Sequence, residues 1–230
     1  MEKRIFWIGD STVHFNHFDT WPQRGVGQEL GAYLRDQVVI HNHAENGRST
    51  KSFWDEGLFE PVEKALKPGD LLFIQFGHND PKSEDPHRYA TPEEYRENLR
   101  RYANIARAAG ALPVLITPLT RRRFEGGVLT VSHGPYPDAM RSLAKEENIT
   151  LIDLTVSSRK VVEAMGDEKS KEFYMYFPAG VYPNYPQGSD DNTHLRPAGA
   201  YCFAGLVAEG LKALGGVYAE LLYVPEEETK

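Results

Sequence analysis

Short runs of apolar residues recur along the chain and are separated by longer stretches of mixed polarity. A short apolar run bounded by polar or turn-forming residues is typical of a strand that is buried on both faces of a sheet. The sequence predicts five such strands, at Ile5–Ile8, Val38–Ile40, Leu71–Phe76, Val114–Ile116 and Leu151–Leu154.

The stretches between these runs carry helical patterns. The clearest begins at Thr91-Pro92-Glu93-Glu94, a capping box with proline at the first helical position, and Gly110 provides a stop. Apolar residues at helical spacing predict further helices over Gln28–Leu34, Ser52–Leu66, Asp138–Glu146, Val156–Met165 and Pro197–Leu214.

Strand and helix therefore alternate along the chain. Because each parallel pairing needs a crossover connection, this alternation predicts a parallel sheet with helices on both faces. The expected fold class is a three-layer α/β/α arrangement with a five-stranded parallel sheet, formed by residues 1–230 as a single domain. One stretch, Glu172–Asn192, is rich in tyrosine, proline and glycine and is predicted to be a long irregular loop with a functional role.

Charge and composition exclude several classes of protein. A formal net charge of -7 argues against nucleic-acid partners, which require a dense basic surface. No run of about 18 apolar residues occurs, so neither a membrane span nor a membrane partner is expected. Cys202 is the single cysteine, and an intramolecular disulfide is therefore impossible. The first residues lead directly into the Ile5–Ile8 strand without the pattern of an export signal, so a cytoplasmic location is expected.

Residues directly after each predicted strand are the first candidates for chemistry, because ligands bind beyond the carboxyl ends of parallel strands. The first strand is followed by Gly9-Asp10-Ser11-Thr12. Gly9 permits a sharp turn that would bring the Ser11 hydroxyl to the ligand side of the sheet. Taken alone, the motif is more often a helix cap formed by Asp10 or Ser11.

The second and third strands are also followed by polar groups. Asn46-Gly47 offers a backbone N–H to a ligand, although Asn-Gly is also a common turn dipeptide. His78, Asn79 and Asp80 follow the very apolar third strand, and an amide side chain at this point can donate to an oxyanion. An Asx turn closed by Asn79 or Asp80 is the competing interpretation.

The segment Asp191-Asn192-Thr193-His194 precedes the last predicted helix. Its spacing allows the Asp191 carboxylate to meet the His194 ring, which leaves the other ring nitrogen free to accept a proton from Ser11. A serine hydroxyl needs such a base to act as a nucleophile. An isolated Asp-x-x-His is more often a surface feature, but in combination with the other motifs it predicts a catalytic triad.

Together these motifs resemble the four conserved blocks of the SGNH (GDSL-type) hydrolases. They occur in the order of that family over nearly the whole chain: Gly9-Asp10-Ser11, Gly47, Gly77-x-Asn79-Asp80 and Asp191-x-x-His194. The resemblance implies a flavodoxin-like sheet, with Ser11 as nucleophile, His194 as general base and Asp191 as the orienting partner. It also implies an oxyanion hole formed by the backbone N–H groups of Ser11 and Gly47 and by the Asn79 side chain. Neither a metal nor an organic cofactor is implied.

Within that superfamily, Gly-Asp-Ser-Thr with Gly-His-Asn-Asp is similar to the rhamnogalacturonan acetylesterases, which remove acetyl groups from a pectic polysaccharide. Thr12 replaces the usual leucine of the first block, in agreement with this branch. Because a cytoplasmic location is expected, acetylated oligosaccharides are the expected substrate. Candidate sugar contacts are His78, Trp54, Arg121 and Tyr182. Arg121 belongs to a run of three arginines after the fourth strand and would attract a galacturonate carboxylate.

Several alternatives remain open. A metal-dependent phosphoesterase or deacetylase would use His41 and His43 with Asp190 and Asp191, although no recognised ligand set is complete. A non-catalytic carbohydrate-binding protein would keep the same fold without turnover. Lipase, thioesterase or arylesterase activity is also compatible with the predicted triad, since one catalytic core serves many esters. The sequence does not indicate the oligomeric state.

Overall fold

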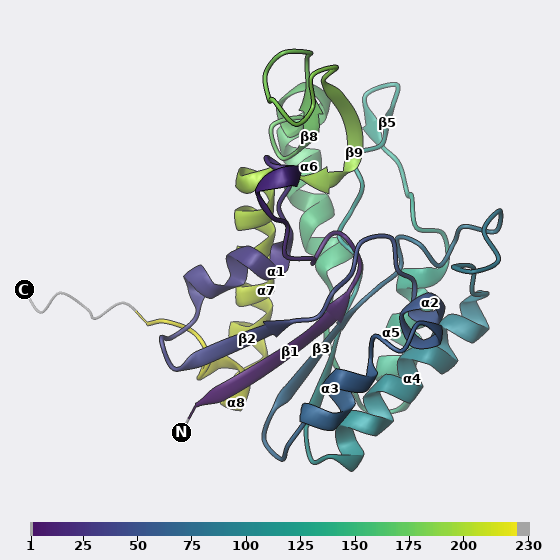
Figure 1. Cartoon of the computed structure of the whole chain (residues 1–230), viewed down its shortest axis with the longest axis vertical. Coiled ribbons are helices and arrows are strands. Elements are labelled where there is room, and N and C mark those ends of the chain that lie inside the picture. Colours follow the sequence, from purple (N-terminus) through teal and green to yellow (C-terminus); the bar gives the residue numbers. More distant parts are fainter. Residues whose placement is uncertain (1, 225–230) are drawn as a thin grey trace, which may run out of the picture.

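Five parallel strands form the central sheet of the computed structural model, which describes residues 2–224 (Figure 1). The strands are β1 (Lys3–Gly9), β2 (Val38–Asn42), β3 (Leu71–Gln75), β4 (Leu112–Ile116) and β7 (Thr150–Ile152). Their order in the sheet is β2-β1-β3-β4-β7, and all neighbouring pairs are parallel. The predicted fold class is confirmed, and each predicted strand overlaps one of these five.

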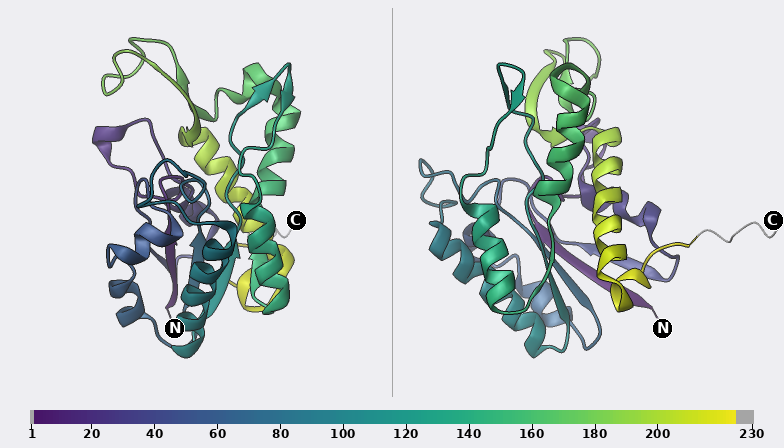
Figure 2. Two further views of the ribbon diagram at one scale, coloured as in Figure 1. Left: turned by 90° about the vertical axis from the view of Figure 1, so that its right-hand side faces the viewer. Right: turned by 180° about the vertical axis from the view of Figure 1, so that it is seen from behind.

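Helices cover both faces of the sheet, as the views in Figure 2 show. The elements on one face are α1 (Val26–Glu29), η2 (Leu30–Tyr33), α6 (Leu154–Ser170), α7 (Pro197–Leu214) and α8 (Gly216–Ala219). Those on the other face are α2 (Thr50–Asp55), α3 (Glu60–Ala65), α4 (Pro92–Ala108) and α5 (Tyr136–Glu146). A short 3-10 helix, η1 (Phe18–Thr20), lies in the connection between β1 and α1.

The side chains of β1 divide the apolar core into two parts. Ile5 and Trp7 contribute to the cluster beneath α6 and α7, whereas Phe6 and Ile8 contribute to the cluster beneath α4 and α5. Successive residues of a strand point to opposite faces, and here both faces are covered by helices. This arrangement explains why the run carries no polar alternation.

Two helix predictions need correction. The predicted Ser52–Leu66 helix is two short helices, α2 and α3, separated by Gly57, whose φ of +72° is not helical. The predicted Gln28–Leu34 helix is shared between α1 and η2. The structure gives α7 the predicted bounds, and α4 begins at the predicted capping box. There, Thr91 Oγ1 accepts from the Glu94 N–H at 3.2 Å, and the Thr91 N–H donates to Glu94 Oε2 at 2.8 Å.

Strand β2 is less buried than its apolar run predicts. All five of its residues are only partly buried. The reason is its position at the edge of the sheet, where it has one neighbouring strand, β1.

Two antiparallel hairpins stand above the carboxyl edge of the sheet (Figure 1). One consists of β8 (Tyr174–Phe177) and β9 (Ser189–Leu195), so the prediction that Glu172–Asn192 is irregular throughout was wrong. The other, unpredicted hairpin consists of β5 (Phe124–Glu125) and β6 (Val128–Leu129) and turns at two glycines with positive φ. Both hairpins extend the fold on the side where ligands bind to parallel sheets.

Candidate active site

Ser11 lies in a tight turn at the end of β1. A Cβ atom on Gly9 would lie 2.7 Å from the carbonyl oxygen of Gln75, so only glycine fits at this point without a shift of backbone. The buried Asp10 carboxylate accepts hydrogen bonds from the Thr12 N–H at 2.9 Å and from the Thr12 hydroxyl at 2.8 Å. Asp10 therefore closes the turn, in agreement with the capping role considered for it. The Ser11 hydroxyl takes no part in this cap and lies against His194.

Ser11, His194 and Asp191 form a chain of hydrogen bonds. Ser11 Oγ is 2.8 Å from His194 Nε2, and His194 Nδ1 is 2.5 Å from Asp191 Oδ2. When Nδ1–H donates to the carboxylate, Nε2 carries the lone pair that can accept the hydroxyl proton. The structure thus brings together the three predicted triad residues in the geometry that activates a serine.

A bulge in β9 produces this geometry. Because the register of β9 on β8 shifts, residues 191–194 lie opposite Met175 alone. Within the bulge, Asp191 Oδ1 accepts hydrogen bonds from the N–H groups of Thr193 at 2.8 Å and His194 at 3.1 Å. A bulge re-aims the side chains that leave the ladder, and here it directs His194 towards the end of β1.

The surroundings of Asp191 keep its carboxylate charged. Burial raises its pKa, but the hydrogen bond and charge of His194, together with the backbone N–H donors of the bulge, outweigh burial and bring the pKa to about 2. At neutral pH the carboxylate is therefore ionised. An ionised partner both orients the imidazole and stabilises the imidazolium that forms during catalysis.

The three predicted oxyanion donors follow three adjacent strands, β2, β1 and β3. Gly47, after β2, has a φ of +77°, which favours glycine. Asn79, after β3, is 4% exposed, and its Nδ2 donates to the carbonyl of Arg48 at 2.9 Å. The Asn79 side chain thus bonds to the neighbouring loop and not to its own turn. This contact holds the amide of Asn79 beside the Gly47 loop, and Ser11 follows the strand that lies between β2 and β3.

Asp80 has a structural role that the sequence did not reveal. Its Oδ1 accepts hydrogen bonds from the Thr50 N–H at 2.9 Å and the Thr50 hydroxyl at 2.6 Å, at the start of α2. Burial raises the pKa of Asp80 to about 7, against the opposing effect of the two Thr50 donors. Asp80 thereby links the loop that carries Asn79 to a helix of the core.

Comparison with known proteins identifies the family. Residues 7–200 match the model of the GDSL-like Lipase/Acylhydrolase family. The chain belongs to this family. It is therefore a serine hydrolase that acts on esters, and the resemblance found in its four sequence motifs is confirmed.

Two relatives of this GDSL-like hydrolase come from Bacillus subtilis. The rhamnogalacturonan acetylesterase RhgT is 42% identical over 213 residues, which are 92% of this chain and 90% of the relative. YesY, described as a probable rhamnogalacturonan acetylesterase, is 39% identical over 94% of this chain and 95% of its own length. Among solved structures, YxiM of the same organism matches with a TM-score of 0.79 at 30% identity over 94% of this chain, which spans 58% of that longer protein.

His78 lies beneath the site of the GDSL-like hydrolase and not on its surface. The residue is 2% exposed, its Nδ1 is 3.1 Å from His133 Nε2, and the Arg121 guanidinium donates to its carbonyl oxygen at 2.8 Å. Burial, followed by the charges of its neighbours, holds the pKa of His78 well below its ordinary value. The predicted sugar contact through His78 is wrong, because its ring is enclosed by protein.

The three arginines after β4 have different surroundings. Arg121 is partly buried, and burial lowers its pKa although the carboxylate of Asp191 is among the groups that raise it. Arg122 is 5% exposed and donates to the Asn192 side chain at 2.7 Å. Arg123 is exposed and pairs with a nearby glutamate on β5. Arg121 follows β4 on the ligand side of the sheet and bonds to His78, whereas Arg122 is buried among structural partners. A galacturonate contact through Arg121 stays a prediction.

The two predicted aromatic sugar contacts, Trp54 and Tyr182, lie in different parts of the fold. Trp54, on α2, packs against Phe59, and the guanidinium of Arg101 lies 4.6 Å from its ring centroid. Trp54 is only partly buried and lines a pocket with residues of α3, so a sugar contact through Trp54 stays a prediction. Tyr182 packs edge-on against Phe177 with centroids 4.7 Å apart, in the hairpin that carries the triad histidine. A sugar contact through Tyr182 stays a prediction.

The structure does not assemble the alternative metal site. His41 and His43 both stack on Phe6, with ring centroids 4.8 and 5.9 Å away, whereas Asp190 and Asp191 belong to the β8–β9 hairpin. Across residues 2–224, no group of three or more His, Cys, Asp and Glu side chains is arranged to hold a metal ion. The metal-dependent alternative therefore lacks a ligand cluster in the described part of the chain.

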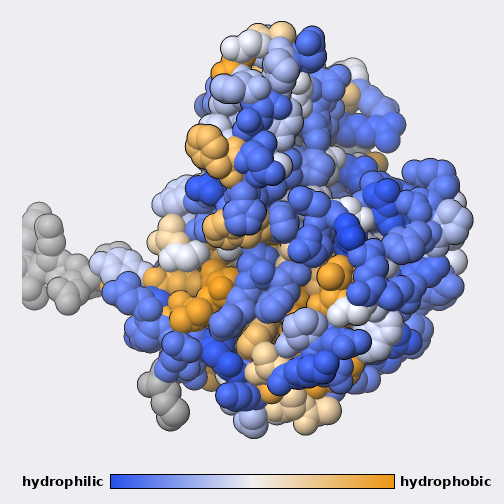
Figure 3. Space-filling view, in the orientation of Figure 1, coloured by the Kyte–Doolittle hydropathy of each residue, from blue (hydrophilic) through white to orange (hydrophobic). Residues whose placement is uncertain are grey.

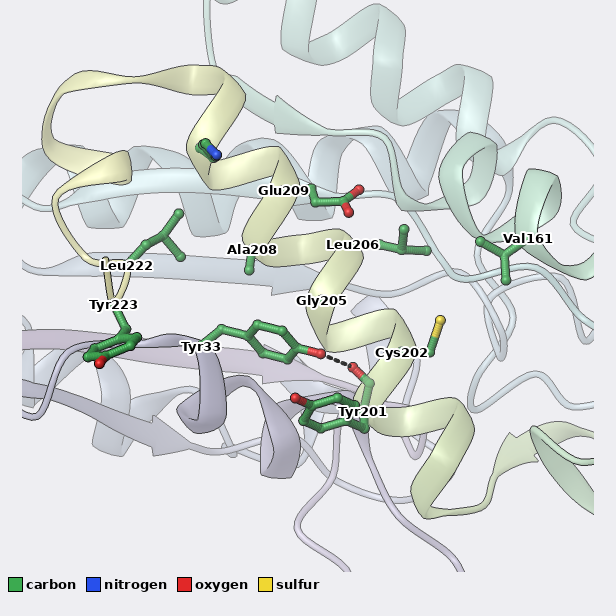
Figure 4. Close-up of a pocket in the computed structure, with 11 residues that line it drawn as sticks. Tyr33, Val161, Tyr201, Cys202, Gly205, Leu206, Ala208, Glu209, Leu222 and Tyr223 are labelled. Atoms are coloured by element: carbon green, nitrogen blue, oxygen red, sulfur yellow. Dashed lines mark hydrogen bonds between the residues drawn. The ribbon is translucent and has the colours of Figure 1, made fainter. Parts of the chain in front are cut away.

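A separate hollow lies along α7 (Figure 4). Its lining includes Tyr33, Tyr201, Cys202 and Leu206, and the Tyr33 hydroxyl donates to the Tyr201 carbonyl at 3.0 Å. Apolar side chains also gather near the C-terminal part of the described chain (Figure 3). No triad residue lines this hollow. None of the helices within residues 2–224 is long and apolar enough to cross a membrane.

Proposed function

We propose that this protein is a carbohydrate esterase that removes acetyl groups from pectic, rhamnogalacturonan-derived oligosaccharides. The observation that carries the proposal is the hydrogen-bonded chain from Ser11 through His194 to Asp191 in a GDSL-like hydrolase. Two relatives that align over more than nine-tenths of this chain are described as rhamnogalacturonan acetylesterases, which supports both the acetyl group and the pectic substrate.

Ser11 attacks the acetyl carbonyl carbon while His194 Nε2 accepts the hydroxyl proton. The tetrahedral intermediate collapses, the bond to the sugar oxygen breaks, and His194 returns its proton to that oxygen, so the sugar leaves as an alcohol. Water then attacks the acetyl-enzyme with His194 again as the base, and acetate and free Ser11 are released. Asp191 remains ionised throughout, in agreement with its pKa of about 2.

The developing oxyanion requires donors that are in place before the reaction begins. We assign this role to the N–H groups of Ser11 and Gly47 and to Nδ2 of Asn79. Their positions after three adjacent strands support the assignment, because the sheet holds these loops side by side. Preorganised donors of this kind stabilise the charge without any rearrangement at the moment of reaction.

Labelling with a serine-reactive phosphonate tests the nucleophile. Peptide mass analysis is expected to find the label on Ser11, and Ser11→Ala is expected to remain unlabelled and inactive towards p-nitrophenyl acetate. Label on any other residue would overturn the assignment. Sugar binding without turnover by the unmodified protein would favour the non-catalytic alternative.

The acyl group and the alcohol are tested with a substrate panel. Acetate release is expected to be fastest from acetylated pectic oligosaccharides and slower from acetylated xylan and chitin oligosaccharides. Faster hydrolysis of long-chain acyl esters or thioesters would instead favour the lipase or thioesterase alternative.

Two cations after adjacent strands of the sheet support an acidic substrate. Lys82 follows β3 and Arg121 follows the neighbouring strand β4, so both lie on the ligand side of the sheet. Burial lowers the pKa of Lys82, and the charges of Arg88 and Arg121 lower it further. Within residues 2–224, neither Lys82 nor Arg121 forms an ion pair. Cations without carboxylate partners, in a protein of net charge -7, favour an anionic ligand. We therefore assign Arg121 to recognition of a galacturonate carboxylate.

Arg121→Gln tests this assignment. The variant is expected to raise KM for acidic acetylated oligosaccharides about tenfold or more, the order expected for a lost charge-assisted hydrogen bond. KM for p-nitrophenyl acetate is expected to be unchanged, since this ester has no carboxylate. Arg123→Gln, in the exposed neighbouring arginine, is the matched control. An equal rise in KM for both esters would contradict the assignment.

We also propose a cytoplasmic location. The presence of a single cysteine, Cys202, is compatible with a reducing compartment, because the fold uses no intramolecular disulfide. Fractionation of the native producing cells, with activity measured in each fraction, tests the proposal. Recovery of the activity outside the cytoplasm would overturn it.

A further inference from the structure

Arg122 is a buried arginine that contacts four segments: β5, β8, α6 and β9, the last of which carries Asp191 and His194. Its guanidinium lies 4.9 Å from the ring centroid of Tyr176 on β8 and 5.7 Å from that of Phe124 on β5. The same group forms an ion pair with Asp167 on α6, and its Nη1 donates to Asn192 Oδ1 at 2.7 Å. A guanidinium that is 5% exposed needs such partners, because an unpaired buried charge is very unfavourable.

Asn192 is the link between this arginine and the triad. It lies in the β9 bulge, directly after Asp191 and two residues before His194. Its carbonyl oxygen accepts from the Arg122 N–H at 2.8 Å, while its side-chain oxygen accepts from the guanidinium. Residues of a bulge lose the regular ladder bonds that would otherwise fix their position. The two contacts with Arg122 therefore hold the backbone on which Asp191 and His194 sit.

The arginine is itself anchored to a helix. Gly166, with a φ of +73°, interrupts α6, and the carbonyl oxygen of the next residue, Asp167, accepts from Arg122 Nε at 3.2 Å and Nη2 at 2.7 Å. The guanidinium thus has two sets of hydrogen-bond partners, one in Asp167 and one in Asn192. Contacts with Asp167 fix the arginine to the core, and contacts with Asn192 fix the bulge to the arginine.

We propose that Arg122 and Asn192 are positioning residues for the triad, because together they hold the β9 bulge so that His194 meets Ser11. The proposal rests on the proposed serine-esterase function. Arg122 acts through Asn192 and not on the substrate. Its loss is therefore expected to reduce the chemical step and to leave binding of small esters almost unchanged.

Two single variants separate positioning from stability. Asn192→Ala removes the side-chain acceptor and leaves the ion pair with Asp167. It is expected to lower kcat for p-nitrophenyl acetate about 100-fold with little change in KM, since a small misplacement of catalytic groups has an effect of this order. Asp167→Asn removes the ion-pair partner and keeps the contact with Asn192. It is expected to lower Tm and to keep kcat close to that of the unmodified protein.

A conservative variant and a matched control complete the experiment. Asn192→Asp keeps an acceptor oxygen for Arg122, so it is expected to recover most of the kcat that Asn192→Ala loses. Arg123→Ala changes the exposed neighbouring arginine and is expected to leave kcat and Tm unchanged. The rate at which a phosphonate labels Ser11 is expected to follow kcat across the series, which reports activation of the nucleophile without any sugar substrate.

Unchanged kcat in Asn192→Ala would overturn the proposal. Equal losses of kcat in Asn192→Ala and Asp167→Asn would also overturn it, because both variants would then act through general stability. If the unmodified protein neither hydrolyses p-nitrophenyl acetate nor reacts with the phosphonate, the serine-esterase function itself fails, and the positioning role fails with it.

Discussion

Asp191, Asp80 and Asp10 have the same side chain but different pKa shifts, because their surroundings differ. Burial acts on all three and favours the neutral form. At Asp191 the contacts with His194 outweigh burial and bring the pKa to about 2, whereas at Asp80 burial prevails and raises the pKa to about 7. Burial also raises the pKa of Asp10 against the donors of Thr12. Of these three carboxylates, only the one paired with the catalytic base has a pKa below its ordinary value.

The raised pKa of Asp80 predicts a pH-dependent stability. Because the pKa in the folded state lies above that of an aspartate in the unfolded chain, the protonated carboxyl favours folding, and its contribution is lost as pH rises through about 7. Asp80→Asn, which cannot ionise, is expected to weaken this dependence. Urea unfolding between about pH 5 and 8 measures the change in the free energy of unfolding. Equal slopes for both proteins would contradict the prediction.

Asn79→Ala is expected to lower kcat for acetate esters about 10²–10³-fold, the usual effect of removing one oxyanion donor. KM is expected to change little, because the donor acts mainly on the charged intermediate. Steady-state kinetics with p-nitrophenyl acetate measure both constants. Since Asn79 also bonds to the Arg48 carbonyl, Tm is measured in parallel. A loss confined to KM would show that Asn79 binds the ester instead.

At the scale of elements, the two halves of the site are positioned by different kinds of structure. Ser11, Gly47 and Asn79 follow parallel strands whose register is maintained by apolar packing on both faces. Asp191 and His194 lie in a bulge of an antiparallel hairpin, where side-chain contacts replace part of the ladder. The nucleophile half therefore follows from the sheet, and the base half depends on particular polar contacts.

The capping box of α4 gives a prediction at this scale. Thr91→Ala removes the side-chain acceptor of the Glu94 N–H and is expected to lower the free energy of unfolding by about 1 kcal/mol. For a protein of this size the corresponding fall in Tm is about 2–4 °C. Calorimetry measures the fall, and kcat for p-nitrophenyl acetate is expected to stay unchanged because the cap is exposed. Reduced kcat at unchanged Tm would contradict this prediction.

At the scale of the whole molecule, a negative overall charge contrasts with two cations that follow adjacent strands of the sheet. The chain carries a formal net charge of -7, yet Lys82 and Arg121 follow two neighbouring strands, β3 and β4, on the ligand side of the sheet. Such an arrangement favours an anionic oligosaccharide at one place while the rest of the surface repels it.

Salt is therefore expected to affect acidic and neutral substrates differently. Raising the salt concentration from about 0.01 M to 1 M shortens the Debye length from about 30 Å to about 3 Å. KM for acetylated galacturonate oligosaccharides is expected to rise over this range, whereas KM for p-nitrophenyl acetate is expected to stay nearly constant. A parallel rise for both substrates would contradict an electrostatic contribution to recognition.

The sequence by itself determined the sheet and the nucleophile half of the site. Apolar runs without alternation predicted five strands, and the structure places them in one parallel sheet. Since the carboxyl ends of parallel strands share one edge, the polar residues after the first three strands were expected to meet there. Ser11, Gly47 and Asn79 all follow such strands, and this information is local in the sequence.

The sequence also named Asp191 and His194, but only the tertiary structure decided how the base half of the site is held and what surrounds the predicted contacts. The bulge depends on pairing between β8 and β9 and on Arg122 and Asn192, which are 70 residues apart. His78 looked like a possible sugar contact, but its ring is enclosed by His133 and Arg121 from elsewhere in the chain. Burial and hydrogen bonding arise from segments that are distant in sequence, so local patterns could not reveal whether a polar side chain faces substrate or supports the fold.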